Sequence, residues 1–178
     1  ALQPKRLNNG TMCREKRGEA GTTSSAKTSE PGRQQAIPNI HAAIEQIHLC
    51  FDGRIVCASG ADWLKVELQL AKVALMPDFE GRIFSGHEMP RSKPAPDVYL
   101  AAAAAVGVHP SRCAVVEDTV TGVMAGVAAG CMVFGYAPPH AQTTEHAALL
   151  AAGARHTFTD MLHLPSLLSQ KMAQSMPS

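Results

Sequence analysis

From residue 37 onward, short apolar runs alternate with longer segments in which apolar residues recur every three or four positions. The runs predict buried strands, and the periodic segments predict amphipathic helices. The expected strands are 54–58, 81–85, 113–116, 131–136 and 156–159, and the expected helices are 40–48, 62–74, 96–106, 121–129, 141–152 and 162–170. Strands that alternate with helices indicate an α/β fold, in which helices cover both faces of a parallel sheet.

The first 36 residues differ from the rest of the chain, because they are rich in charged and small polar residues and contain no apolar run. Such a segment cannot bury enough apolar surface to offset the entropy of ordering it. We therefore expect a disordered or atypical segment over 1–36, a core domain over 37–170 and a short tail over 171–178. A basic binding arm is the alternative, since the segment has seven Lys/Arg against three Glu, but it lacks interleaved aromatic residues.

Composition narrows the class of protein. The chain has 178 residues, 46% of them hydrophobic, which is enough for one domain with a real core. Its formal charge of +1 argues against nucleic acid as a partner. Five cysteines without a Cys-x-x-Cys pair are typical of reduced thiols in an intracellular protein. No apolar run reaches the ~18 residues of a membrane span, and no signal peptide is evident. We expect a cytoplasmic protein with no membrane partner.

Three polar features follow predicted strands, where parallel sheets bind their ligands. Ser59 and Gly60 end the first strand at the start of a turn into a helix. A hydroxyl group and free backbone N–H groups there could hold phosphate oxygens, although Ser59 could equally be only a helix cap. Lys93 is followed by two prolines, which stiffen its loop, and Asp97 is expected to cap the next helix. A lysine held in this way can neutralise a phosphate.

The third feature is the pair Glu117 and Asp118 at the end of an apolar strand. Two adjacent carboxylates repel each other unless a cation is present, and Mg²⁺ binds one or two carboxylates together with water and phosphate oxygens. Thr119 can cap the following helix. Glycines recur every fourth residue at 122, 126 and 130, which predicts a close approach of that helix to the sheet.

Together, and in this order, these features resemble the second, third and fourth motifs of the haloacid dehalogenase (HAD) superfamily, in particular its sugar-phosphate phosphatases and β-phosphoglucomutase relatives. Residues 93–97 read Lys-Pro-Ala-Pro-Asp, and residues 116–130 read Val-Glu-Asp-Thr-Val-Thr-Gly-Val-Met-Ala-Gly-Val-Ala-Ala-Gly. Thr119 stands where Ser is commoner. The resemblance covers residues 37–168 and implies a three-layer, Rossmann-like α/β core with a parallel sheet.

The resemblance also implies roles. In that superfamily an Asp nucleophile attacks phosphorus, a second Asp two residues later acts as acid and base, and Mg²⁺ neutralises charge. Ser59 and Gly60 would bind the phosphoryl oxygens, and Lys93 would stabilise the nucleophile and the phosphate, so that Ser59 and Lys93 are the candidate catalytic residues. Asp118 would bind Mg²⁺, and Glu117 would be a second ligand or orient a ligating water. The substrate would be a small phosphorylated metabolite, such as a sugar phosphate.

The chain departs from that pattern because it contains no Asp-x-Asp sequence. The nearest match places Cys50 at the nucleophile position and Asp52 at the acid/base position, but a turn before the next strand is the preferred interpretation of this segment. In the superfamily, the strand that precedes Asp-x-Asp lies between the strands that end here at Ser59 and Asp118. Its absence predicts a gap of about one strand spacing, ~4.8 Å, with unpaired backbone groups on both sides. The helical cap is also absent.

Two hypotheses about function follow. The chain is either a shortened Mg²⁺-dependent phosphatase, or a non-catalytic pseudo-phosphatase or incomplete fragment that holds Mg²⁺ and phosphate. Its sheet could close directly between the remaining strands or borrow a strand from a partner, which makes self-association possible. A dinucleotide-binding fold is disfavoured, since no Gly-x-Gly-x-x-Gly follows the first strand.

Overall fold

The computed structural model describes residues 36–138 and 145–174. The helices are α1 Ile40–Cys50, α2 Trp63–Lys72, α3 Met76–Phe79, α4 Asp97–Ala105, α5 Val120–Ala128, α6 His146–Ala151 and α7 Leu164–Gln174. The strands are β1 Cys57–Ser59, β2 Ile83–Ser85, β3 Ala114–Glu117, β4 Met132–Tyr136 and β5 His156–Phe158. Short 3-10 helices lie at Gly86–Glu88, Pro110–Arg112 and Met161–His163. Among the described residues, no helix is long and apolar enough to cross a membrane.

The predicted alternation of strands and helices is confirmed, with differences at the boundaries. The first strand begins at Cys57 rather than at residue 54, because its partner β2 begins only at Ile83, which is paired with Cys57. The sequence pattern did not predict α3, whose four residues are too few to show helical periodicity. Residues 141–144 of the predicted sixth helix and the segment 1–35 lie outside the described residues.

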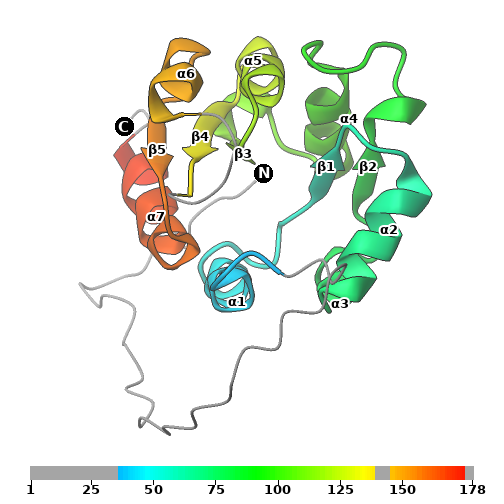
Figure 1. Ribbon diagram of the computed structural model, residues 1–178, viewed down its shortest axis with the longest axis horizontal. Coiled ribbons are helices and arrows are strands. Elements are labelled where there is room, and N and C mark those ends of the chain that lie inside the picture. The colour runs from blue at the N-terminus through cyan, green and yellow to red at the C-terminus, as the bar shows by residue number, and fades with distance from the viewer. Residues whose placement is uncertain (1–35, 139–144, 175–178) are drawn as a thin grey trace, which may run out of the picture.

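The strands form two separate sheets instead of one (Figure 1). Strands β1 and β2 pair in parallel, and β3, β4 and β5 form a second parallel sheet in that order. In the described part of the chain no ladder joins β1 to β3. The predicted gap between the strands that end at Ser59 and Glu117 is therefore present, and the alternative in which the sheet closes directly is wrong.

Helices cover both faces of the larger sheet, as expected for a three-layer fold (Figure 1). On one face α1 and α7 pack on β4 and β5 through a cluster that includes Phe51, Phe134 and Leu168. On the other face α4, α5 and α6 pack on β3 and β4 around Val123 and Leu149. A third cluster joins α1 to α2, α3 and the smaller sheet. Helix α1 thus bridges the two sheets and holds them in one structure.

The glycines of α5 have different roles. A Cβ atom on Gly126 would lie 2.8 Å from Val133 Cγ2, so the helix approaches the sheet closely there, as the spacing predicted. At Gly122 the Cβ atom would instead collide with the side chain of Glu117. The prediction is wrong for Gly130, which has open space around its Cα atom and a φ of +80°. Gly130 serves the turn that ends the helix.

Candidate active site

The carboxyl ends of β1 and β3 meet at the amino group of Lys93, although the two strands are not paired. Lys93 Nζ donates to the carbonyl oxygen of Ala58 at 3.3 Å, and it forms an ion pair with Glu117 Oε1. It also donates to the hydroxyl of Tyr99 at 2.8 Å, on the first turns of α4. Lys93 therefore links the carboxyl ends of the two unpaired strands, of which β1 ends at Ser59 and β3 at Glu117.

Both carboxylate oxygens of Glu117 accept hydrogen bonds within the cluster around Lys93. Its Oε1 atom accepts hydrogen bonds from Lys93 and from the Tyr99 hydroxyl, and its Oε2 atom accepts from Thr119 Oγ1 at 3.1 Å. The side chains of Lys93 and Glu117 are only 12% and 9% exposed. Burial, and next the charge of Glu117, raise the pKa of Tyr99 far above its usual value, so this hydroxyl stays protonated and continues to donate.

Local sequence explains how Glu117 reaches this position. Thr119 caps α5 by accepting a hydrogen bond from the Gly122 N–H at 3.1 Å, as predicted for a capping threonine. The carboxylate then lies against the first turn of α5, where a Cβ atom at position 122 would come within 2.1 Å of Glu117 Cδ. Gly122 is therefore required for the buried pose of Glu117.

Ser59 is not the cap of α2, because Asp62 has that role and accepts from the backbone of Leu64 and Lys65. Instead, Ser59 Oγ accepts from the Ala61 N–H at 3.1 Å within the loop that follows β1. A hydroxyl group has one proton to donate, and no described residue accepts it from Ser59. The N–H of the exposed Gly60 likewise makes no backbone hydrogen bond with a described residue. Both groups are available to an anion.

Two residues of β2 and its loop position the Ser59 loop. Ser85 is fully buried, and its hydroxyl donates to the carbonyl oxygen of Ala61 at 2.8 Å. A Cβ atom on the buried Gly86 would lie 3.2 Å from the Cα atom of Gly60, so the two loops are in close contact. The loop that carries Ser59 and Gly60 is therefore held from the neighbouring strand.

Asp118 differs from its neighbour because it is exposed. Its pKa is raised, first by partial burial of the carboxyl group and next by the charge of Glu117, while a backbone hydrogen bond and, after it, the charge of Lys93 act in the opposite direction. Asp118 is thus the more exposed carboxylate of the pair. Within the described residues no group of three or more His, Cys, Asp or Glu side chains could hold a metal ion. A Mg²⁺ ion at this position would therefore have to take most of its ligands from water or phosphate oxygens.

The prediction that Asp97 caps the helix after Lys93 is wrong. Pro96 occupies the cap position, and Asp97 is the first residue of α4. The Asp97 carboxylate accepts two hydrogen bonds from Arg91, at 3.3 Å from Nε and 2.9 Å from Nη2. This bidentate pair closes the loop around Lys93, so Asp97 supports the lysine in a different way from the one expected.

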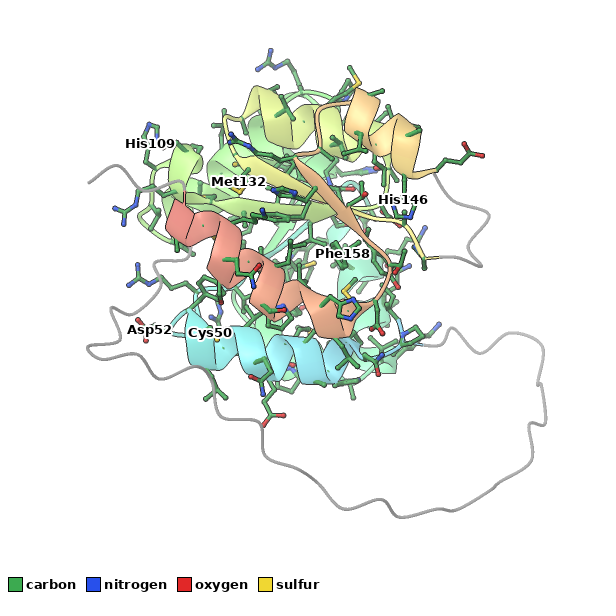
Figure 2. All side chains as sticks on the ribbon, turned by 90° about the vertical axis from the view of Figure 1, so that its left-hand side faces the viewer. Cys50, Asp52, His109, Met132, His146 and Phe158 are labelled. Atoms are coloured by element: carbon green, nitrogen blue, oxygen red, sulfur yellow. The ribbon has the colours of Figure 1, made fainter. Side chains whose placement is uncertain are left out.

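The alternative that Cys50 and Asp52 stand at the nucleophile and acid/base positions is also wrong. Cys50 ends α1, and Asp52 lies in the following turn with a φ of +54° (Figure 2). That turn leads to the amino end of β1, whereas Glu117 is the last residue of β3 and Lys93 contacts the carboxyl end of β1. The two residues are therefore at the wrong edge of the sheet, and the predicted turn is confirmed.

Sequence reasoning did not identify Tyr99, Ser85 or Gly86 as parts of the site. Tyr99 could have been noticed, because it is the single aromatic residue of an Ala-rich helix and lies six positions after Lys93. Ser85 and Gly86 give no comparable signal, since a serine and a glycine after a strand are ordinary turn residues.

These features define an α/β protein with a buried lysine–glutamate pair, an exposed carboxylate and free anion donors at the carboxyl edge of its strands. The family model described as haloacid dehalogenase-like hydrolase matches residues 27–130. The chain therefore belongs to the haloacid dehalogenase-like hydrolase family, as the sequence motifs predicted.

Individual relatives agree with this assignment. The 6-phosphogluconate phosphatase of Escherichia coli K12 is 33% identical over 104 residues, which are 58% of this chain and 44% of that protein. A probable pseudouridine-5'-phosphatase of Drosophila melanogaster is 32% identical over 76% of this chain and 58% of its own length. The structure of a HAD family hydrolase from Deinococcus radiodurans R1, with bound phosphate and sodium, has a TM-score of 0.70 and 28% identity, over 78% of this chain and 61% of that one. The chain thus spans about half the length of these relatives.

Proposed function

We propose that this chain forms the phosphate- and Mg²⁺-binding side of a phosphatase site for small phosphorylated metabolites, of which sugar phosphates are the preferred class. The observation that carries the proposal is the convergence of Lys93, Ser59 and Asp118 at one edge of two sheets. The names of the relatives, which include 6-phosphogluconate phosphatase and hexitol phosphatase A of Escherichia coli, support the substrate class.

Each residue has a distinct task in this proposal. The hydroxyl of Ser59 and the N–H of Gly60 donate to two phosphoryl oxygens, which are hydrogen-bond acceptors only. Lys93 supplies the positive charge that attracts the phosphate, and Glu117 is a positioning residue that fixes Lys93 rather than a metal ligand, since both of its oxygens are already bonded. Asp118 would hold Mg²⁺, which, when bound, neutralises phosphate charge.

A non-catalytic binder is the second candidate, and one observation favours it. The printed sequence has no Asp-x-Asp pair, and the carboxylate that pairs with Lys93 in the described site, Glu117, is already engaged by Lys93, Tyr99 and Thr119. Loss of a nucleophile that forms a covalent intermediate lowers the rate by about 10⁴- to 10⁶-fold, by analogy with nucleophile knockouts in other enzymes. Phosphate binding needs only the groups that the site retains.

The test combines turnover with binding. Phosphate release from an aryl phosphate is measured with and without Mg²⁺ for the full chain, for Asp118→Asn and for the matched control Glu80→Gln, an exposed carboxylate on the loop before β2. Orthophosphate binding is followed in parallel by ³¹P NMR. Mg²⁺-dependent turnover that Asp118→Asn abolishes and Glu80→Gln preserves supports the phosphatase. Binding without turnover supports the binder, and a folded chain that shows neither contradicts both.

A further inference from the structure

Two cysteines lie next to each other at the amino ends of neighbouring strands. Strands β3 and β4 run in parallel, with Ala114 opposite Met132. The Met132 N–H donates to the carbonyl oxygen of Cys113 at 3.0 Å, so the pairing begins before the strands themselves. Taken back by one residue, the same register sets Cys113 opposite Cys131, and both are free thiols. The fold thus brings together two thiols that the sequence keeps apart.

The two cysteine side chains share one face of the sheet. Side chains of an extended strand alternate between faces, so residues two positions apart lie on the same face. Val115 and Val133, two positions after the cysteines, are register partners and belong to the cluster under α4, α5 and α6. Cys113 has an extended backbone, and Cys131 packs against that cluster as well. Neighbouring strands are about 4.8 Å apart, within the range of about 4.4–6.8 Å that a disulfide spans between Cα atoms.

The two thiol groups already interact. The Cys113 thiol donates to the carbonyl oxygen of His109 at 3.4 Å, which leaves the sulfur lone pairs free to accept. The hydrogen bond between the two thiols lowers the pKa of Cys113 below its usual value, and the same bond raises the pKa of Cys131. The thiolate is the form of cysteine that attacks an oxidant, so Cys113 is the nucleophile of the pair.

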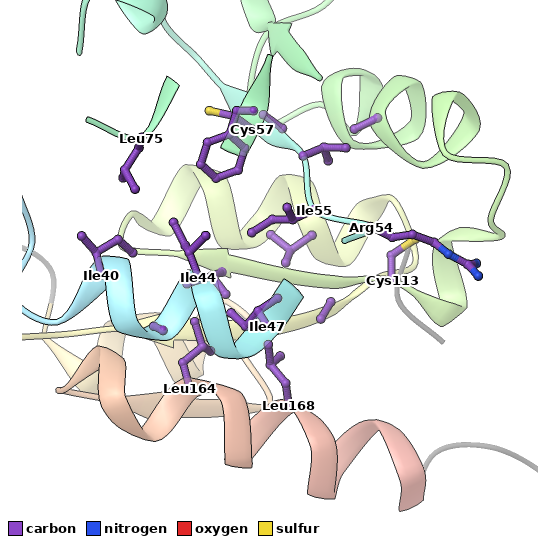
Figure 3. Close-up of a pocket in the computed structure, with 18 of the residues that line it drawn as sticks. Ile40, Ile44, Ile47, Arg54, Ile55, Cys57, Leu75, Cys113, Leu164 and Leu168 are labelled. Atoms are coloured by element: carbon purple, nitrogen blue, oxygen red, sulfur yellow. The ribbon is translucent and has the colours of Figure 1, made fainter. Parts of the chain in front are cut away.

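The surroundings give a small oxidant access to this pair and no competing thiol. Both cysteines line an apolar cavity of about 440 Å³ between the two sheets, with Cys113 at the end that Arg54 borders (Figure 3). Arg54 and Cys131 are partly exposed. Hydrogen peroxide is only slightly larger than water, which occupies about 30 Å³. Cys57 lines the cavity too, but it packs with α1 and α3 on the other face of the sheet layer.

We propose that Cys113 and Cys131 form a peroxide-sensitive dithiol, whose oxidation gives a disulfide that fastens β3 to β4. First the Cys113 sulfur attacks one peroxide oxygen: the S–O bond forms, the O–O bond breaks, and the leaving hydroxide takes the thiol proton to give water. The Cys131 sulfur then attacks the Cys113 sulfur: the S–S bond forms, the S–O bond breaks, and the second hydroxide takes the Cys131 proton. Two thiols lose two electrons, and one hydrogen peroxide becomes two waters.

The new bond would stabilise the part of the chain that carries the carboxylate pair. It closes a loop of about 18 residues that contains α5, Glu117 and Asp118. The bond forms at the amino ends of the strands, whereas Lys93 contacts Glu117 at the carboxyl end of β3. The inference therefore rests on the strand register and does not depend on phosphatase activity.

The test exposes the reduced full chain to a small excess of hydrogen peroxide, then alkylates the remaining thiols and maps the peptides by mass spectrometry. Trypsin places Cys113 and Cys131 together on the peptide 113–155, and the other three cysteines on three further peptides. We expect the peptide 113–155 to resist alkylation and to be lighter by two hydrogen atoms. Cleavage after Glu117 should then give two fragments that stay joined until they are reduced.

The same treatment in concentrated urea is the reference. In the unfolded chain Cys50 and Cys57 close a shorter loop, and a shorter loop costs less entropy, so the pairing should spread to other cysteines. Three results for the folded chain would overturn the proposal. These are a disulfide between any other pair, the same mixture as in urea, and a peptide 113–155 that is still fully alkylated.

Serine variants test the order of the two steps. Cys131→Ser should stop the reaction after the first step, so that dimedone traps a sulfenic acid on Cys113. Cys113→Ser should consume peroxide at least tenfold more slowly than Cys131→Ser. Cys57→Ser is the matched control in the same cavity and should form the disulfide as the wild type does. Equal rates for folded Cys113→Ser and Cys131→Ser contradict the assigned nucleophile, and if either variant does not fold, the peptide map of the wild type decides.

Unfolding in urea tests the effect of the bond. Oxidation should raise the unfolding midpoint of the wild type by about 1 M or more, and dithiothreitol should reverse the rise. Cys131→Ser, treated in the same way, should show no rise. An oxidised chain that carries the disulfide but has an unchanged or lower midpoint would overturn the stabilising role.

Discussion

The Lys93–Glu117 pair gives the sharpest test of the site. Lys93→Met removes the cation but keeps a side chain of similar length, so Glu117 stays buried with only the Tyr99 and Thr119 hydroxyls as donors. Removing one partner of a buried ion pair costs about 3–5 kcal/mol. Because these two hydroxyl donors remain, we expect a loss near the lower end, about 3 kcal/mol, or roughly a 100-fold change in the folding equilibrium.

A neighbouring pair is the matched control. Arg91 and Asp97 form a bidentate pair in the same loop, but the Arg91 side chain is 68% exposed. Exposed pairs contribute about 0–1 kcal/mol, so Arg91→Met should cost at most about 1 kcal/mol. Both variants remove one positive charge, which makes their difference a measure of burial rather than of net charge.

The assay is urea unfolding followed by circular dichroism. With a slope of about 1–3 kcal/mol/M, the loss of about 3 kcal/mol in Lys93→Met should lower the midpoint by about 1–3 M, and Arg91→Met should lower it by less than half of that. In the double variant Lys93→Met/Glu117→Gln the buried charge is gone as well, so its loss should be smaller than the sum of the single losses by about 2 kcal/mol or more. Equal midpoints for Lys93→Met and Arg91→Met, or strictly additive losses in the double variant, would refute the reasoning.

Two further predictions concern a glycine and an acid. Gly122→Ala should displace Glu117 from Lys93, since the new Cβ atom would lie 2.1 Å from Glu117 Cδ, and it should lower both the urea midpoint and the orthophosphate affinity. The control Thr121→Ala, at an exposed neighbouring position, should change neither quantity. A Gly122→Ala variant with unchanged midpoint and affinity would contradict the buried position of the Glu117 side chain. Hydrogen bonds from the Leu162 N–H, and next from Asn39, lower the pKa of the Asp160 carboxyl group in the folded chain. Ionised Asp160 therefore stabilises the folded state at pH values above its unfolded pKa of about 3.9. This stabilisation is lost as the pH falls through the folded pKa. The difference in unfolding midpoint between the wild type and Asp160→Asn should therefore narrow below about pH 4, and a constant difference down to pH 2 would contradict this assignment.

The local pattern of apolar and polar residues along the sequence predicted the helices, the strands and the outline of the site. The change between apolar runs and helical periodicity located the strands and helices, because these patterns reflect which faces become buried. Thr119 was recognisable as a cap and Gly126 as a point of close approach, since each depends on neighbours within a turn or on one packed face. Lys93, Glu117 and Asp118 were recognisable from their place after apolar strands, in a pattern that resembles a known family.

Only the tertiary structure determined which partner each polar group has. It assigned both oxygens of Glu117 to Lys93, Tyr99 and Thr119, whereas the neighbouring Asp118 is exposed. It also paired Asp97 with Arg91 instead of the helix end, and it placed Cys50 at the edge of the sheet away from the site. The reason is physical: periodicity and capping act within a few residues of the chain, whereas the pairing of a buried charge or an open strand edge depends on segments that only folding brings together.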